Sequence, residues 1–345
     1  MAGGPVLIGL PGPGLDEQTR EWLQHPLVGG IVLFSRNYEG REQVEGLAAE
    51  LHVASEPRPL VCIDQEGGRV QRLDGEGFTR LPPLGVLGRL HDSDPVKALD
   101  MAYRHGRVMA MEMLVTGIDL SFAPVLDLDR GSRVIGDRSF SADPEVVVSL
   151  GRSYLAGMRD AGMKCTGKHF PGHGSVVADS HVDDVSDDRP LDEIRQSDLQ
   201  PFHELMPLLD ALMIAHVVYP RVDRLPAGYS KTWLQDILRA ELGYRGVVIS
   251  DDLGMHAARA AGSVRERVEN CLGAGCDVVL VCQPEDAQAL MDDPPEPLLQ
   301  AGSPVEPLYG RAAIDRQQLA AVKSEGIREW EYWRSSLERL GASWS

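Results

Sequence analysis

Short apolar runs recur along the chain at intervals that fit strands alternating with helices. Each run ends at, or is followed by, a glycine, a polar residue or a charged residue. The eight runs are Val6–Leu10, Gly30–Phe34, Leu60–Asp64, Asp119–Ala123, Lys164–Lys168, Ala211–Ala215, Val247–Asp251 and Asp277–Val281. Strands that are apolar throughout are typical of a parallel sheet covered by other elements. The pattern therefore predicts eight buried parallel strands.

Segments with helical periodicity lie between most of these runs. They are 98–114, 146–161, 191–209, 232–242 and 264–274, each with apolar residues three or four positions apart. An open doubly wound sheet would more often carry a glycine-rich phosphate loop after its first strand. Here Pro11-Gly-Pro-Gly14 follows that strand, and prolines lack the amides that cradle phosphate. We therefore expect an α/β fold, a single (β/α)8 TIM barrel over residues 1–345.

The end of the chain predicts a helical extension of the barrel at 303–345. Residues 311–340 return to helical spacing, and four apolar side chains share one face: Trp330, Trp333, Leu337 and Leu340. We expect this extension to pack on the barrel.

Composition narrows the classes of partner. The net charge of −18 and the lack of a Lys/Arg cluster argue against nucleic acid and against an anionic membrane surface. No apolar stretch is long enough to span a bilayer, and the N-terminus lacks the pattern of a signal peptide. The five cysteines are odd in number and sit mostly in or beside apolar segments, which indicates reduced, buried thiols. We expect a cytoplasmic monomer.

Chemically active side chains follow the predicted strands. Asp64, Asp127, Lys168 with His169, His216 and Asp251 stand at strand ends. A barrel brings all of these ends to one face, where barrel enzymes place their active sites. A polar residue at a single strand end is often only a helix cap or a turn residue. That explanation is insufficient when five strand ends carry charged or imidazole side chains.

Two loops add candidate groups. The run from Asp64 to Arg72 contains two glycines, which would let the backbone approach a ligand closely, and Arg138 lies in the long loop after the fourth strand. The segment 171–190 is too long for an ordinary connection and predicts a functional lid. Within it, Asp179 stands two residues before His181 and could hold the imidazole ring and stabilise its protonated form.

Three stretches carry a family resemblance. They are Lys168-His-Phe-Pro-Gly-His-Gly174 with Asp179-Ser-His181, Asp64-Gln-Glu-Gly-Gly-Arg-Val-Gln-Arg72, and the segment 237–254 that ends in Ser250-Asp251-Asp252-Leu-Gly254. Together they closely resemble glycoside hydrolase family 3, in particular its single-domain bacterial β-N-acetylglucosaminidases of peptidoglycan recycling. The resemblance covers the chain from Val6 to about Gln283.

The resemblance implies specific roles. It makes Asp251 the nucleophile, His181 the acid/base and Asp179 the partner of His181. It also implies N-acetylglucosamine-binding roles for five residues: Asp64, Arg72, Arg138, Lys168 and His169. The implied substrates are N-acetylglucosaminyl-1,6-anhydro-N-acetylmuramic acid and its peptides, with neither a metal nor a cofactor.

Several alternatives remain at this point. A neutral histidine base would not repel phosphate, so the same site could perform phosphorolysis. Asp251-Asp252 also leaves open a mechanism in which the substrate's acetamido group is the nucleophile. His169, His173, Asp179 and His181 could be metal ligands of a barrel hydrolase. Finally, the chain could bind the sugar without turnover.

Overall fold

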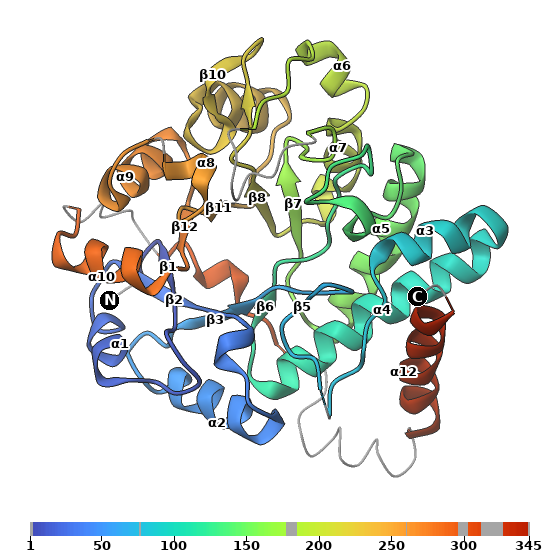
Figure 1. Cartoon of the computed structure of the whole chain (residues 1–345), viewed down its shortest axis with the longest axis horizontal. Coiled ribbons are helices and arrows are strands. Elements are labelled where there is room, and N and C mark those ends of the chain that lie inside the picture. Colours follow the sequence, from blue (N-terminus) through green and yellow to red (C-terminus); the bar gives the residue numbers. More distant parts are fainter. Residues whose placement is uncertain are drawn as a thin grey trace.

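Eight parallel strands form the central sheet of the protein (Figure 1). The structure is a computed structural model that describes residues 3–75, 77–176, 185–259, 261–295, 303–311 and 327–343. The strands are β1 (Val6–Gly9), β2 (Val28–Leu33), β3 (Leu60–Ile63), β6 (Leu120–Ser121), β7 (Thr166–Phe170), β8 (Ala211–Ile214), β11 (Val247–Asp252) and β12 (Val278–Val281). Their order in the sheet is β6-β3-β2-β1-β12-β11-β8-β7. All eight fall on the apolar runs of the sequence.

The sheet closes on itself between β6 and β7. Val125, just after β6, forms a parallel bridge with Lys168 of β7. The Leu126 N–H donates to the Lys168 carbonyl at 2.7 Å, and the Thr166 N–H donates to the Ala123 carbonyl at 2.9 Å. The predicted (β/α)8 barrel is therefore confirmed.

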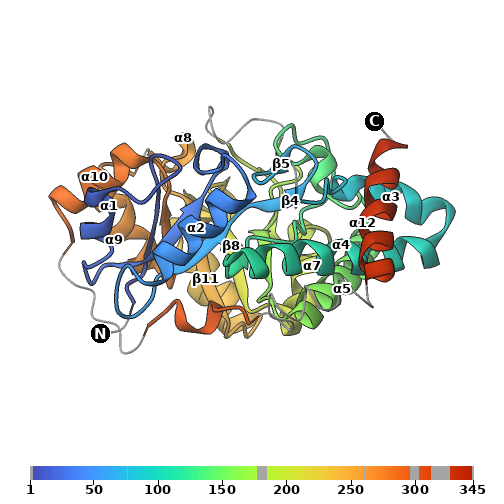
Figure 2. The ribbon, with the colours of Figure 1, turned by 90° about the horizontal axis from the view of Figure 1, so that it is seen from below.

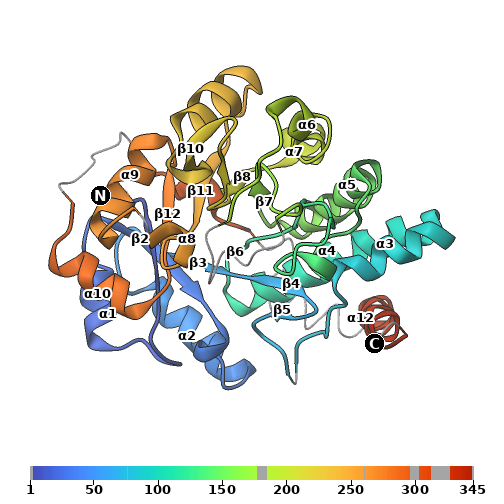
Figure 3. The same cartoon turned by 45° about the horizontal axis from the view of Figure 1, so that its top comes forward.

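Helices surround the strands on the outside of the barrel (Figure 3). They are α1 (Glu17–Trp22), α2 (Arg41–His52), α3 (Leu84–Ser93), α4 (Pro95–Thr116), α5 (Pro144–Ala161), α6 (Leu191–Arg195), α7 (Leu199–Leu205), α8 (His256–Arg259), α9 (Val264–Ala274), α10 (Pro284–Asp292) and α12 (Ile327–Ala342). Short 3-10 turns are η1 (Ser35–Asn37), η2 (Gly136–Arg138), η3 (Met206–Leu208), η4 (Ala227–Tyr229) and η6 (Glu306–Leu308), and η5 (Thr232–Glu241) is a π-helix. Two hairpins, β4 (Gln65–Gly67) with β5 (Val70–Gln71) and β9 (Val218–Tyr219) with β10 (Asp223–Pro226), stand outside the barrel sheet.

The long helices begin at residues suited to that position. Asp94 and Asp143 cap α4 and α5 by accepting backbone N–H groups, and a proline takes the first helical position of each. Ser263 and Glu266 form a capping box at the start of α9. These local signals explain why the predicted segments 98–114, 146–161 and 264–274 are helical.

Two elements differ from the sequence prediction because of prolines. The single helix expected at 191–209 is divided into α6, α7 and η3. A continuous helix would press the Pro201 ring against the preceding turn and lose a hydrogen bond. The fourth strand is only two residues long, since Pro124 has no N–H to continue the ladder.

The barrel interior is filled by alternate side chains of the strands. Leu7, Cys62 and Leu280 belong to an inner apolar cluster, whereas their neighbours along each strand pack outward against the helices. Val305 and Leu308, beside and within η6, belong to the same inner cluster. Figure 2 shows this segment at the end of the barrel opposite β4, β5 and α8. The barrel is thus closed at its floor and open for chemistry at the other end.

Helix α12 lies against α4 at the edge of the molecule (Figure 1). Its Arg334 Nε donates to the Thr79 hydroxyl at 2.6 Å and lies 3.3 Å from a carboxylate oxygen of Glu112 in α4. Leu337 is fully buried. The rest of the helical stretch expected at 311–340, residues 312–326, lies outside the described residues.

None of the helices in the described ranges is both long and apolar enough to cross a bilayer.

Candidate active site

A polar cavity of about 370 Å³ opens at the carboxyl ends of the barrel strands. Its walls include six of the residues expected at the site: Asp64, Arg72, Arg138, Lys168, His169 and Asp251. The remaining two, Asp179 and His181, lie outside the described residues. The structure therefore brings together side chains from β7, from β11 and from the segments after β3, β5 and β6, which are far apart in the sequence.

The β4–β5 hairpin returns Arg72 to Asp64. Gly67 and Gly68 turn the chain with φ angles of 108° and 56°, a region that favours glycine. The Gln65 side chain then accepts the Arg72 N–H at 3.0 Å, and the Arg72 guanidinium lies 3.3 Å from the Asp64 carboxylate. From the sequence, these glycines were expected to let the backbone approach a ligand closely. Instead, a side chain on either would meet Pro82 or Pro83 at 2.6 Å, so they serve the packing of the hairpin.

Four charged side chains of the cavity wall form one network, in which Glu66, Arg138 and Lys168 are buried and Asp64 is partly exposed. Lys168 Nζ lies 2.7 Å from Asp64 and 2.5 Å from Glu66. Arg138 binds Glu66 with two parallel hydrogen bonds of 2.8 Å and donates a third to the Val134 carbonyl. Lys168 has three donors, and the described residues occupy two of them, so one N–H is left for a ligand oxygen.

The network fixes the protonation state of its members. Burial alone would raise the pKa of Asp64, but Lys168 and Arg72 lower it overall. Burial opposes ionisation of Glu66 as well, yet Arg138 and Lys168 hold the pKa of Glu66 well below its usual range. Burial favours neutral Lys168, but Asp64 and Glu66 raise the pKa of Lys168 overall. All these groups are charged at neutral pH, and their charges are largely balanced by one another.

Asp127 organises the loop that follows β7. One of its carboxylate oxygens accepts the His169 N–H and lies 2.6 Å from His169 Nδ1, and the other accepts the His173 N–H at 2.7 Å. The buried Asp127 has a lowered pKa, because His169 and His173 outweigh the cost of burial. Asp127 thus sets the orientation of the His169 ring at the cavity wall.

The two carboxylates at the end of β11 are held differently from each other. Asp252 accepts backbone N–H groups from Gly254 at 2.9 Å and Cys282 at 3.0 Å. Burial, with Asp251 adding to it, raises the pKa of Asp252. Asp251 accepts only the Asp252 N–H, at 2.8 Å, among the described residues, and its other oxygen is not engaged there. Asp251 therefore has one carboxylate oxygen that accepts no hydrogen bond from the described residues, and this oxygen is available for reaction.

Sequence reasoning missed Glu66 as a site residue. Its position could have indicated a role at the site, because Glu66 stands two residues after Asp64 in the same run. Its main partner, Arg138, is however 72 positions away in the sequence. Arg138 was expected to hold a ligand oxygen, and it does line the cavity. Much of its hydrogen bonding is nevertheless directed at Glu66 and Val134. Within the described ranges, no group of three or more His, Cys, Asp or Glu side chains could hold a metal ion.

Comparison with known proteins defines the class of this site. The model of the glycosyl hydrolase family 3 N-terminal domain matches residues 9–295. A β-hexosaminidase of Stenotrophomonas maltophilia strain K279a is 55% identical over 282 residues, which are 81% of this chain and 84% of the relative. A β-hexosaminidase of Aromatoleum aromaticum is 52% identical over 292 residues, with 84% and 82% covered.

Solved structures agree in sequence and in shape. The crystal structure of NagZ from Neisseria gonorrhoeae in complex with N-trifluoroacetyl-D-glucosamine has a TM-score of 0.90 and 40% identity, with 99% of each chain covered. A family 3 β-N-acetylglucosaminidase from Paenibacillus sp. has a TM-score of 0.78 and 33% identity, covering 99% of this chain and 62% of that chain. The chain belongs to glycoside hydrolase family 3, and it is a glycoside hydrolase.

Proposed function

We propose that the enzyme is a retaining exo-β-N-acetylglucosaminidase of peptidoglycan turnover. Its class is β-N-acetylhexosaminidase, in line with its relatives. It removes the terminal non-reducing N-acetylglucosamine from N-acetylglucosaminyl-1,6-anhydro-N-acetylmuramic acid and its peptides. The observation that carries the proposal is the cavity in which Asp251 faces the paired charges of Asp64, Arg72 and Lys168.

The cavity suits one sugar unit. A volume of about 370 Å³ is at the small end of ligand sites, which supports removal of a single terminal residue. Lys168, Arg72 and Asp64 offer donors and acceptors for sugar hydroxyls. The N-trifluoroacetyl-D-glucosamine bound by the Neisseria relative supports an N-acylglucosamine unit in this cavity.

The first chemical step forms a glycosyl ester. The free carboxylate oxygen of Asp251 attacks the anomeric carbon, and the bond to the leaving oxygen breaks while His181 donates a proton to that oxygen. Asp179, two residues before His181 in the sequence, favours the protonated imidazole. The product is an α-linked ester on Asp251 and a free aglycone alcohol.

The second step reverses these roles. His181, now neutral, takes a proton from water as the water oxygen attacks the anomeric carbon and displaces the Asp251 carboxylate. Two inversions give net retention, so the sugar is released as the β-anomer. In phosphorolysis, phosphate would replace water in this step and yield a sugar phosphate.

The test is release of N-acetylglucosamine from synthetic N-acetylglucosaminyl-1,6-anhydro-N-acetylmuramic acid, followed by NMR. We expect the β-anomer first, and the same product with and without phosphate. A nitrophenyl β-glucoside should react at least about 100-fold more slowly than the corresponding N-acetyl-β-glucosaminide. This difference in rate corresponds to the loss of a few hydrogen bonds to the acetamido group. Equal rates on the two would refute the substrate assignment, and a sugar phosphate would replace hydrolysis by phosphorolysis.

A further inference from the structure

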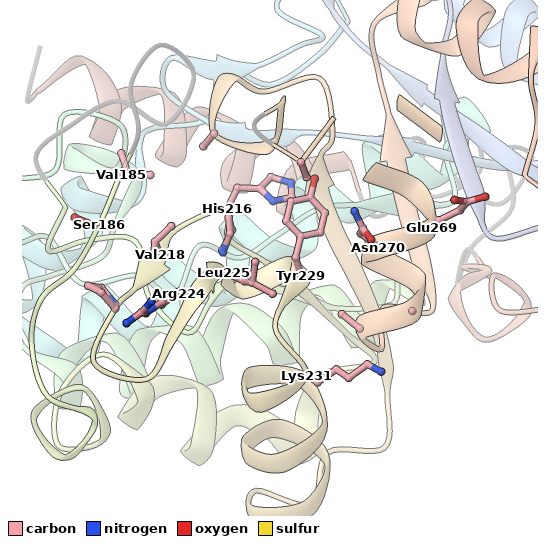
Figure 4. A pocket seen from close by; sticks show the side chains of 16 residues that line it. Val185, Ser186, His216, Val218, Arg224, Leu225, Tyr229, Lys231, Glu269 and Asn270 are labelled. Carbon is pink, nitrogen blue, oxygen red and sulfur yellow. The ribbon is translucent and has the colours of Figure 1, made fainter. Parts of the chain in front are cut away.

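His216 is a strand-end group for which the mechanism described above has no use. It stands just after β8 and is only 1% exposed. It lines a second cavity, of about 890 Å³, and none of the described residues of that cavity also lines the active-site cavity. In Figure 4 its ring lies beside that of Tyr229, with the two ring centroids 5.6 Å apart. Any part of His216 in the reaction therefore has to act through another residue.

The imidazole of His216 reaches the backbone of the proposed nucleophile. β8 and β11 are neighbours in the sheet, and Asp251 follows the last pair of their ladder, Ile214 with Ser250. His216 Nε2 lies 3.1 Å from the backbone carbonyl oxygen of Asp251. A carbonyl oxygen only accepts hydrogen bonds, so we assign the ring hydrogen to Nε2. Burial lowers the pKa of His216 more than Asp251 raises it, so a neutral ring donates this bond at pH 7.

The carbonyl of Asp251 belongs to the same peptide group that holds the Asp251 carboxylate. The other end of this peptide group is the Asp252 N–H, which donates to a carboxylate oxygen of Asp251 at 2.8 Å. A peptide group is planar, so its carbonyl and its N–H turn together. His216 therefore fixes one end of a plane whose other end orients the carboxylate. The bond to the carbonyl also polarises the peptide group and strengthens the N–H as a donor.

The strand on the other side of β11 gives this part of the backbone an irregular ladder. The pairing of β11 with β12 shifts register between Ile249 and Asp252. Within that stretch the Leu280 N–H donates to the Ser250 hydroxyl oxygen at 3.1 Å. A break in the ladder weakens the restraint that a sheet places on its strand. The imidazole on the β8 side thus holds the peptide group after Asp251 where the sheet holds it less well.

We propose that His216 is a positioning residue for the nucleophile. Its Nε2–H keeps the Asp251–Asp252 peptide group in the plane that directs the Asp251 carboxylate at the anomeric carbon. Without this bond the peptide group rotates, and the attacking oxygen leaves its line of approach. Sugar binding is not affected, because Asp64 and Lys168 are held by their own ion pair. The inference rests on the proposed function, in which Asp251 is the nucleophile.

The test compares two substitutions of similar length at position 216. His216→Gln places an amide N–H near the position of Nε2, whereas His216→Met has no donor. His216→Met should lower kcat on a nitrophenyl N-acetyl-β-glucosaminide by about 30-fold, because a displacement on the order of 1 Å costs up to about 100-fold. His216→Gln should recover at least about tenfold of this loss. The inhibition constant of N-acetylglucosamine should stay within about threefold in both variants.

The backbone amide of Asp252 gives a readout that does not depend on activity. The amide proton signal, followed by NMR on the intact enzyme, reports the strength of the N–H as a donor. We expect this signal to move upfield in His216→Met, because the peptide group is then less polarised and less well aligned. In His216→Gln it should stay close to its position in the wild type.

His105 offers a matched control for the loss of a buried histidine. It is fully buried, and its Nε2 lies 2.9 Å from the Pro82 carbonyl oxygen. It lines neither the active-site cavity nor the second cavity. His105→Met should therefore destabilise the fold in urea unfolding, as His216→Met does, and leave kcat within about threefold. Should His216→Met not fold, His216→Asn replaces it, since its amide is too short to reach the Asp251 carbonyl.

Two results would overturn the role of His216. The Met and Gln variants could have equal kcat values, or His216→Met could lose activity while the Asp252 amide signal stays unchanged. Asp251→Ala, measured in parallel, separates this inference from the proposed function. An active Asp251→Ala would remove the nucleophile on which the inference rests. An inactive Asp251→Ala together with a fully active His216→Met would refute the role of His216 alone.

Discussion

The two sides of the active-site cavity hold their carboxylates in different ways. On the side of β3 and β7, Asp64 and Glu66 are bound by Lys168 and Arg138, and the charges balance. On the side of β11, Asp251 and Asp252 accept only backbone N–H groups within the described residues, and no described cation forms an ion pair with either. On the β3 and β7 side each carboxylate is paired with a cation. On the β11 side the carboxylate of Asp251 has no cation paired with it among the described residues.

This difference follows the demands of glycoside chemistry. A cation bound to a carboxylate lowers its electron density and its nucleophilicity, so a nucleophile is best held by weaker partners. A recognition surface for neutral hydroxyls, in contrast, needs fixed donors and acceptors, which a buried ion-pair network supplies at a stable position. This difference supports the proposal that bond formation takes place on the β11 side of the cavity and sugar binding on the β3 and β7 side.

The largest expected effect comes from removing the uncompensated carboxylate. Asp251→Ala should lower kcat by at least about 10⁴-fold with every leaving group, because no other oxygen can form the glycosyl ester. Steady-state rates with nitrophenyl and natural substrates measure it. Asp252→Asn is the matched control, since its amide oxygen can still accept the N–H groups of Gly254 and Cys282. A measurable rate in Asp251→Ala and none in Asp252→Asn would move the nucleophile by one position.

The next effect tests the proposed proton donor, His181. His181→Ala should slow natural disaccharides by about 10²- to 10⁴-fold, and activated nitrophenyl glycosides much less in the first step. The second step still needs a base. Stopped-flow measurements should therefore show a burst of nitrophenol followed by slow turnover, as the Asp251 ester accumulates. Asp179→Ala should show a milder form of this pattern. Equal slowing of both substrate types without a burst would make His181 a binding residue.

Part of this contrast could be predicted from the sequence. The barrel strands are continuous apolar runs whose polar ends must meet at one face, so Asp64, Lys168, His169 and Asp251 were predicted to lie together, and they do. Arg72 was predicted from the same run as Asp64. Strand ends are predictable because the local pattern of apolar and polar residues indicates which residues of a parallel strand are buried and where the strand ends.

Pairing across the barrel could not be predicted in the same way. Glu66 binds Arg138 from a distant loop, and no local spacing specifies that contact. The β4–β5 and β9–β10 hairpins were also missed, since their strands of two to four residues carry too little periodicity.

A third prediction concerns the ion-pair network of Asp64, Glu66, Lys168 and Arg138. Glu66→Gln leaves Lys168 and Arg138 buried with one carboxylate fewer, and it should destabilise the protein by about 3 kcal/mol. Urea unfolding at pH 7 measures this loss. Glu50→Gln is the control, because Glu50 pairs with Arg20 at the surface and should change stability by less than about 1 kcal/mol. Similar small losses in both variants would show that the network carries little stability.

The same variant gives a pH signature. The pKa of Glu66 is lowered by folding, so its contribution to stability is complete above the unfolded pKa of about 4.3 and is lost as the pH falls below it. The stability difference between the wild type and Glu66→Gln should be constant from pH 8 to about 5.5 and should shrink in more acid solution, by up to about 1.4 kcal/mol per pH unit. A difference that grows below pH 4 would contradict the lowered pKa.

The smallest effect is expected at the exposed edge of the network. Arg72 is partly accessible, lies 3.3 Å from Asp64 and stacks its guanidinium over the Phe34 ring at 5.4 Å. Arg72→Gln should change the free energy of unfolding by less than about 1 kcal/mol, because solvent screens this pair. It should still raise KM by about tenfold, since a charged donor to the sugar is lost, and leave kcat within about threefold. Steady-state kinetics and urea unfolding of one preparation give all three values. If Arg72→Gln instead lowered kcat and left KM unchanged, Arg72 would act in the transition state, and the separation of binding and bond formation between the two sides of the cavity would fail.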